Sequence, residues 1–204
     1  YDITNKMIVQ TKLYNYLTSE RECLVEQLRE FKEKGGQRKD IIVADRGFPS
    51  LSLFIELKRM DYDFVIRYNG ENFLKEFDEF AKSKCKDMNI IIDPKKVYKR
   101  KHKKTLLKTI KNVESCKIEL RAVKIKLKTG KIEYLITSFL DKKAMTKQDL
   151  RKIYKMRWEE EENFKYQKYT AEVENFSGKS VENIKQDYHS RILAINLHSL
   201  ILNE

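Results

Sequence analysis

Residues Ile41-Ile42-Val43-Ala44 constrain the fold most, because they form a short, continuously apolar run that is rich in β-branched side chains. Such a run is typical of a strand that is buried on both faces of a central sheet. The segment Asp45–Ser50 follows, in which Gly47 permits a turn and Ser50 can cap a helix. A buried strand that leads through a turn into a helix predicts α/β architecture.

Asp45 is the first candidate site residue, because it stands at the carboxyl end of this predicted strand. A carboxylate at that position projects into the crevice where α/β sheets bind their ligands. The alternative is an aspartate that only caps the turn. The segment by itself leaves both interpretations open.

A second pattern, Y-x2-R-x3-E-x6-K, is formed by Tyr154, Arg157, Glu161 and Lys168. On an α-helix these positions fall within about 60° of one another, at about 100° per residue. One accessible helical stripe would then hold a carboxylate, two cations and an aromatic hydroxyl, which suits a phosphodiester beside a metal ion. The alternative is a solvated face, in which Arg157 and Glu161 form a weak i,i+4 pair and the run 159–162 is exposed.

The rest of the chain alternates between strand-like and helical patterns. Asn69-Gly70 and Thr129-Gly130 predict turns, and a change of phase at Ala122-Val123 predicts a β-bulge. Ser19 with Glu22 predicts a capping box, and Thr146 is a candidate N-cap. The predicted strands are Met7–Gln10, Phe64–Tyr68, Asn89–Ile92, Ile118–Leu127 and Ile132–Ile136, and the predicted helices follow Ser19, Ser50 and Thr146 and occupy Ser180–Leu202.

Composition narrows the class of partner. The 204 residues include 43 Lys and Arg against 31 Asp and Glu, a net charge of +12, which favours a polyanion. No apolar run approaches the roughly 20 residues of a membrane-spanning helix, and there is no secretory signal. Cys23, Cys85 and Cys116 are odd in number and widely spaced, which predicts reduced thiols in a cytosolic protein. The three histidines are too scattered to predict a ligand cluster.

Residues 95–104 form the densest basic run, and Tyr98 lies within it. Such a run suits a phosphate backbone or a stacked base. A solvated loop explains it equally well.

The four-residue pattern and the segment Ala44-Asp45-Arg46-Gly47-Phe48 together resemble the DDE insertion-sequence transposases, in the branch with the Tyr-Arg-Glu-Lys signature. The resemblance implies a ribonuclease H-like core interrupted by a small β-rich insertion. Residues 1–68 and 136–204 would form the core, and residues 69–135 would form the insertion.

The resemblance also implies a function: metal-dependent cleavage of transposon ends and strand transfer, with two Mg²⁺ ions for which Mn²⁺ can substitute. Asp45 and Glu161 would be catalytic metal ligands, and Tyr154, Arg157 and Lys168 would bind DNA. The expected partners are double-stranded DNA, as transposon ends and target, and a second copy when the full-length protein is on DNA. The expected location is the bacterial cytoplasm, at the nucleoid, with no membrane partner.

One departure from the family's pattern affects the expected activity. The family's first catalytic Asp lies upstream of the segment that begins here at Tyr1-Asp2, so Asp2 is not assigned that role. We therefore expect this chain to be a catalytic-core portion that is inactive alone, without the family's amino-terminal DNA-binding region. The alternatives are a non-catalytic remnant or nucleic-acid-binding domain with the same fold, and a different nuclease on the same scaffold.

Overall fold

The structure is a computed structural model that describes residues 1–204 except 35–39, 72, 102–116 and 203–204. The chain divides into two compact units. The sheet unit comprises Ser19–Tyr154, and the terminal unit comprises Tyr1–Thr18 together with Lys155–Glu204. Each unit has a hydrophobic core of its own.

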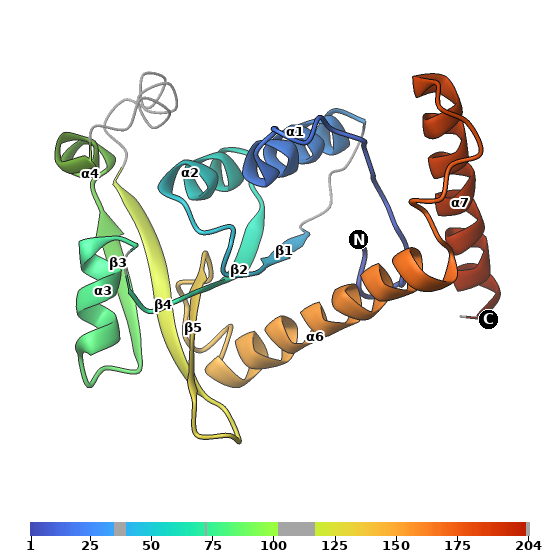
Figure 1. The fold of residues 1–204 in the computed structure, drawn as a ribbon. Helices are drawn as coiled ribbons and strands as arrows, with labels where there is room; N and C mark the ends of the chain where they lie inside the picture. The colour runs from blue at the N-terminus through green and yellow to red at the C-terminus, as the bar shows by residue number, and fades with distance from the viewer. Residues whose placement is uncertain (35–39, 72, 102–116, 203–204) are drawn as a thin grey trace. The chain divides into compact units, whose positions relative to one another are not determined.

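One five-stranded sheet organises the sheet unit, with the strand order β1-β2-β5-β4-β3 (Figure 1). β1 and β2 pair in parallel, whereas the other neighbours pair antiparallel. The predicted α/β class is therefore confirmed as a mixed sheet flanked by helices. The strands are β1 (Ile41–Ala44), β2 (Asp63–Tyr68), β3 (Asp87–Ile92), β4 (Ile118–Lys126) and β5 (Ile132–Thr137), and the helices are α1 (Glu20–Glu33), α2 (Leu51–Arg59), α3 (Lys75–Lys82), α4 (Pro94–Lys101) and the first part of α6 (Lys147–Lys165).

Helices cover both faces of this sheet because side chains alternate along each strand. Phe64, Ile66 and Tyr68 of β2 join the core that α2, α3 and α4 complete on one face, and α1 packs against it. Val65 faces the opposite way, into a second core with Leu150 and Tyr154 of α6. β2 is thus a strand that is buried on both faces.

β1 is an edge strand of this sheet, so the prediction of a central strand is wrong for it, although Ala44 packs in one core and Val43 packs against the other. Ala44 is buried at 7% exposure, but Ile41 is 36% exposed. The apolar run predicted the strand correctly. It did not predict the strand's place, because period and composition do not report which neighbours a strand has.

The predicted bulge at Ala122-Val123 is also wrong. The register of β4 with both β3 and β5 runs through these residues without an extra residue. Ile118, Leu120 and Ala122 face one core, and Val123 and Ile125 face the other. The apparent change of phase arises because different ends of β4 are covered on different faces.

Arg121 explains the polar position that breaks the pattern. Its side chain is fully buried, and its Nε and Nη2 each donate to the Asp87 carboxylate at 2.8 Å. Its Nη1 donates to the carbonyl oxygens of Phe139, at 3.3 Å, and Met145, at 2.6 Å. Arg121 therefore ties β4 to β3 and to the loop that leads into α6.

The local signals of the sheet unit have mixed outcomes. Ser50 caps α2 as predicted, because its Oγ accepts the Leu53 N–H at 3.1 Å. Thr146 and Asp149 cap α6 reciprocally through the hydroxyl, the carboxylate and both backbone N–H groups. Ser19 is the N-cap residue of α1 but makes no side-chain cap bond. Gly130 turns the predicted hairpin with a φ of 83°.

The predicted insertion, residues 69–135, contributes β3, β4 and most of β5 to the same sheet as β1 and β2, together with the unpredicted helices α3 and α4. That residues 69–135 form an insertion in a ribonuclease H-like core stays a prediction. The first part of the basic run, from Lys95 to Lys101, lies within α4. Its residues 102–104 lie outside the described part of the chain.

The helices of the terminal unit are the rest of α6, a short π-helix at Tyr166–Thr170 and α7 (Val181–Leu202). Val173, Ile192 and Ile195 form its buried core. The predicted strand Met7–Gln10 is wrong, since only an isolated bridge joins Asp2 to Met7. The Ile8 backbone instead bonds the Asn196 side chain, at 2.8 Å from its N–H and 2.9 Å to its carbonyl oxygen.

Over the described residues, no helix is both long enough and apolar enough to cross a membrane. Cys23 and Cys85 are free cysteines. Cys116 and His102 lie outside the described residues.

Candidate active site

Asp45 begins a tight turn at the carboxyl end of β1. Its carbonyl oxygen accepts the Phe48 N–H at 3.0 Å, which closes the turn. Arg21 of α1 donates through Nε and Nη2 to the Gly47 carbonyl oxygen, at 3.0 and 2.7 Å. The capped start of α2 follows at once. The position that the sequence predicted for this carboxylate is therefore held from α1, from β1 and from α2.

Tyr154 lies within the same unit and touches the same carboxylate. Its hydroxyl donates to Asp45 Oδ1 at 3.0 Å. Its side chain is 3% exposed, and the ring packs in the core with Val65, Val123 and Leu135. This hydrogen bond links residues 109 positions apart in the chain. The sequence predicted both residues as site residues but did not predict that they would touch.

Arg157 and Glu161 form an ion pair one turn apart on α6. The distance from Arg157 Nη2 to Glu161 Oε1 is 2.7 Å, and the two side chains are 9% and 36% exposed. The Arg157 guanidinium also lies 5.7 Å from the Trp158 ring. The Arg157 side chain is buried and the Glu161 side chain is partly exposed. The pair therefore differs from the fully solvated surface pair of the alternative interpretation.

The neighbouring Glu160 is a further carboxylate of α6, which the sequence pattern did not single out. Burial raises its pKa above the ordinary value, the positive charge of Arg157 lowers it, and the adjacent Glu161 raises it again. Perturbed carboxylates gather at functional sites more often than elsewhere. No sequence signal separates Glu160 from the three other glutamates of its run.

The four residues of the Y-x2-R-x3-E-x6-K pattern do not form one accessible α-helical face. Tyr154, Arg157 and Glu161 lie on α6, but α6 ends at Lys165, and Lys168 lies in the π-helix that follows. A π-helix takes more residues per turn, so the 3.6-residue phase that predicted the stripe does not extend to Lys168. Tyr154 and Arg157 are buried, whereas Lys168 is exposed, with Nζ 5.8 Å from the Tyr169 ring.

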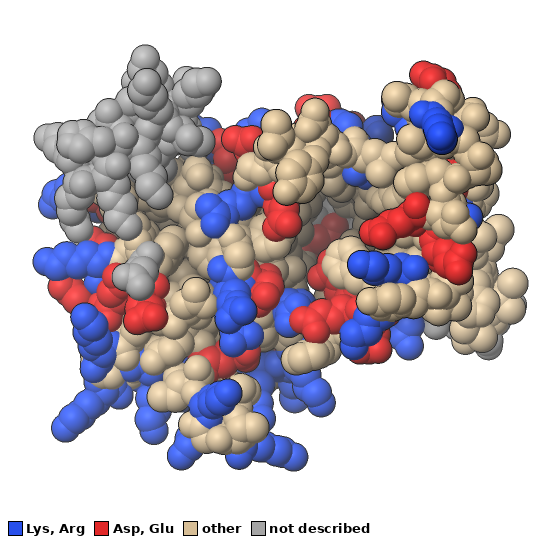
Figure 2. Space-filling view, in the orientation of Figure 1, with Lys and Arg blue, Asp and Glu red and all other residues tan. Residues whose placement is uncertain are grey.

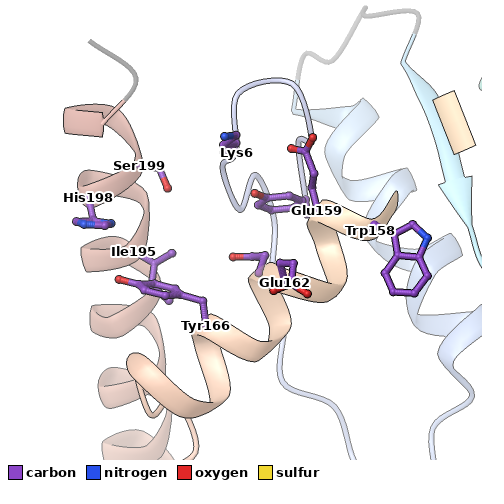
Figure 3. A pocket seen from close by; sticks show the side chains of 10 residues that line it. Lys6, Trp158, Glu159, Glu162, Tyr166, Ile195, His198 and Ser199 are labelled. Atoms are coloured by element: carbon purple, nitrogen blue, oxygen red, sulfur yellow. The ribbon is translucent and has the colours of Figure 1, made fainter. Parts of the chain in front are cut away.

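A pocket of 430 Å³ lies within the terminal unit, beside this part of α6 (Figure 3). Tyr166 and His198 stack at its wall, with ring centroids 6.0 Å apart. Figure 3 shows Glu159 and Glu162 on α6, with Lys6 on the loop opposite. The scattered histidines predicted no ligand cluster, and no sequence pattern predicted this pocket beside His198.

Among the residues that the structure describes, no group of three or more His, Cys, Asp or Glu side chains is arranged to hold a metal ion. Asp45 lies in the sheet unit and Glu161 in the terminal unit. Their convergence at one metal site, with carboxylates within roughly 8 Å given two metals about 4 Å apart, stays a prediction.

The fold and the site together define an α/β protein with a strand-end aspartate and a carboxylate-bearing helix. The model of the transposase DDE domain family matches residues 1–197, so the chain belongs to that family. The expectation of a DDE transposase is thereby confirmed. No curated protein and no solved structure matches the chain.

Proposed function

We propose that this chain is the catalytic-core portion of a transposase of the Tyr-Arg-Glu-Lys branch, with a ribonuclease H-like core that cleaves transposon ends and transfers the strand. Membership of the transposase DDE domain family supports the reaction class. The observation that supports the site is the Asp45 carboxylate, presented at the end of β1 and fixed by the Tyr154 hydroxyl at 3.0 Å. A turn-capping aspartate has no need of a buried tyrosine from a helix 109 residues away.

Asp45 and Glu161 are the proposed metal ligands. Both offer carboxylate oxygens, the hard donors that Mg²⁺ prefers and that Mn²⁺ also accepts. The Glu161 side chain is 36% exposed, which leaves part of it open to a ligand. A pair of bound Mg²⁺ ions would activate the attacking hydroxyl and stabilise the leaving oxygen.

Arg157 and Lys168 are the proposed DNA contacts. Lys168 is exposed on the π-helix and can meet a phosphate directly. Arg157 bonds Glu161 at 2.7 Å, so its charge lies beside the proposed metal ligand. A cation at that place would orient Glu161 and offset the charge of an approaching phosphate. Figure 2 shows that Lys and Arg are spread widely over the visible face, in keeping with the net charge of +12.

No third carboxylate ligand is assigned in this chain. The Asp2 carboxylate accepts the backbone N–H groups of Thr4 and Asn5, at 2.9 and 3.1 Å, as a turn-capping aspartate does. We therefore propose that the isolated chain binds duplex DNA weakly, with affinity that falls steeply with salt, and does not nick it. Metal-dependent nicking that disappears in Asp45→Ala would contradict this, and Asp2 would become the candidate for the third ligand.

The test of the proposed function is end cleavage by the intact transposase. Glu161→Gln and Asp45→Asn should abolish cleavage but leave binding to the transposon end largely intact, because each removes a ligand charge with little change of volume. The matched control is Glu162→Gln. Glu162 lies on the same helix, pairs with Lys165 at 2.6 Å and is exposed. Full activity in Glu161→Gln, or equal loss in the Glu162 control, would refute the assignment.

The second candidate is a nucleic-acid-binding domain that has lost catalysis. The 2.7 Å Arg157–Glu161 pair favours it, because an ion pair along one helix can be purely structural. In that case Glu161→Gln and Arg157→Ala would lower the stability of the fold and the binding of DNA together, and no divalent metal would bind.

A further inference from the structure

The Tyr154 hydroxyl has a partner in this structure that differs from the phosphate the sequence pattern predicted for it. We infer that Tyr154 is a positioning residue, whose hydroxyl holds the Asp45 carboxylate in the orientation that a metal ligand needs, and that it does not contact DNA. This inference rests on the proposed function of Asp45 as a metal ligand. It assigns a different role to one of the four residues of the pattern.

Burial of the Tyr154 ring separates its hydroxyl from a DNA phosphate. Tyr154 is 3% exposed, and its ring is enclosed by the core on the α6 side of the sheet. A phosphate contact would require the hydroxyl to leave this core together with a ring that buries a large apolar area. The hydroxyl of this buried ring instead donates to Asp45 Oδ1 at 3.0 Å.

The geometry of Asp45 is the second argument. The backbone of its turn is fixed by the Phe48 N–H at 3.0 Å and, through the Gly47 carbonyl oxygen, by Arg21 at 2.7 Å. These contacts position the backbone but leave χ1 and χ2 of the carboxylate to other contacts. The Tyr154 hydroxyl supplies one at a carboxylate oxygen. It comes from a ring that core packing holds in place.

The chemistry of metal ligands is the third argument. A ligating carboxylate is ordinarily hydrogen-bonded by a neighbour that sets its orientation, and loss of that neighbour typically costs about 10- to 100-fold in metal affinity or activity. A phenol serves this purpose well, because it donates one hydrogen bond without adding a charge that would compete with the cation. Tyr154 is therefore suited to Asp45 in a way that a lysine would not be.

Tyr154→Phe tests the inference, with Tyr68→Phe as the matched control. Tyr68 is also buried, at 2%, and its hydroxyl bonds the Phe77 carbonyl oxygen at 3.4 Å in the other core of the same unit. Both substitutions remove one buried hydroxyl and keep the ring. We expect similar, small losses of thermal stability from the two.

Two affinities of the 204-residue chain are measured. Its affinity for Mn²⁺ is followed by the electron paramagnetic resonance signal of the free ion, and its affinity for duplex DNA is measured separately. Tyr154→Phe should weaken Mn²⁺ binding about tenfold or more and leave DNA affinity unchanged, and Tyr68→Phe should change neither. Unchanged Mn²⁺ affinity in Tyr154→Phe, or a loss of DNA affinity, would overturn the inference.

Asp45→Asn separates this failure from a failure of the proposed function. If Asp45→Asn weakens Mn²⁺ binding and Tyr154→Phe does not, Asp45 is a ligand and only the role of Tyr154 is wrong. If Asp45→Asn has no effect either, the proposed metal site is wrong and the inference falls with it.

Discussion

Two polar contacts of the sheet unit differ from an ion pair of the terminal unit in burial and in sequence separation. In the sheet unit, Arg121 and Tyr154 are buried and bonded to groups far away in sequence, at Asp87 and Asp45. In the terminal unit, the Glu162–Lys165 pair joins residues three positions apart and is exposed. The large two-faced core of the sheet unit can offset the cost of burying such groups, whereas the small core around Ile192 and Ile195 covers less. The buried pairs of the sheet unit are thus fixed by tertiary packing, whereas the exposed Glu162–Lys165 pair depends on its own helix.

The largest expected effect on stability concerns the buried ion pair of the sheet unit. Asp87→Ala should lower the free energy of unfolding by about 3–5 kcal/mol, because it leaves the fully buried Arg121 without its carboxylate. Glu162→Ala, in the exposed pair of the terminal unit, should cost at most about 1 kcal/mol. Urea denaturation of the two variants measures both. Equal costs would erase the contrast between the units.

Arg157→Ala in the intact transposase should have the next largest effect. We expect binding to the transposon end to weaken and cleavage to fall further than binding, because the variant would lose the proposed phosphate contact together with the 2.7 Å bond to the Glu161 carboxylate. Loss of one charge-assisted hydrogen bond to phosphate should cost about 1.5–3 kcal/mol of binding free energy, which is roughly a 10- to 150-fold loss of affinity. Gel-shift titration and single-turnover cleavage separate the two quantities. Loss of folding in place of binding would identify a structural ion pair.

The smallest expected effect concerns Glu160 and pH. Burial raises its folded-state pKa, so the protonated form is favoured in the fold, and stability falls as pH rises from the unfolded pKa through the folded one. Glu160→Gln removes this penalty. The variant should therefore gain stability over the wild type at pH 7 and lose that advantage at pH 4, near the unfolded value. Thermal melts at the two pH values test the sign, and an advantage that is greater at pH 4 would contradict it.

Most of the sheet unit could be predicted from sequence, because its elements have local signals. The apolar run Ile41–Ala44, the Ser50 cap and the Thr129-Gly130 turn each depend on a few adjacent residues. The place of β1 at the edge, and the unbroken register behind the apparent bulge of β4, depend on neighbours that are distant in sequence. α3 was not predicted although Phe77 and Phe80 lie at helical spacing on its buried face, because a helix of eight residues spans only about two turns.

The site was predicted as residue types and not as contacts. Asp45 and Tyr154 were both singled out, but a helical phase alone placed Tyr154 on an accessible stripe with Lys168. Core packing placed its ring inside the sheet unit, and the π-helix changed the phase before Lys168. Periodicity predicts which residues share a face only while the helix type stays the same. It does not predict whether that face is accessible or buried.

The proposed function predicts that the Asp45 and Glu161 carboxylates bind the same divalent metal ions. Iron(II) bound in such a site and treated with peroxide and ascorbate cleaves the backbone beside its ligands, and Fe²⁺ accepts the same carboxylate oxygens. Applied to this chain, the measurement should give cuts near both Asp45 and Glu161, and Asp45→Asn or Glu161→Gln should each remove both cuts. Cuts at only one of the two residues, unaffected by substitution of the other, would contradict the shared site.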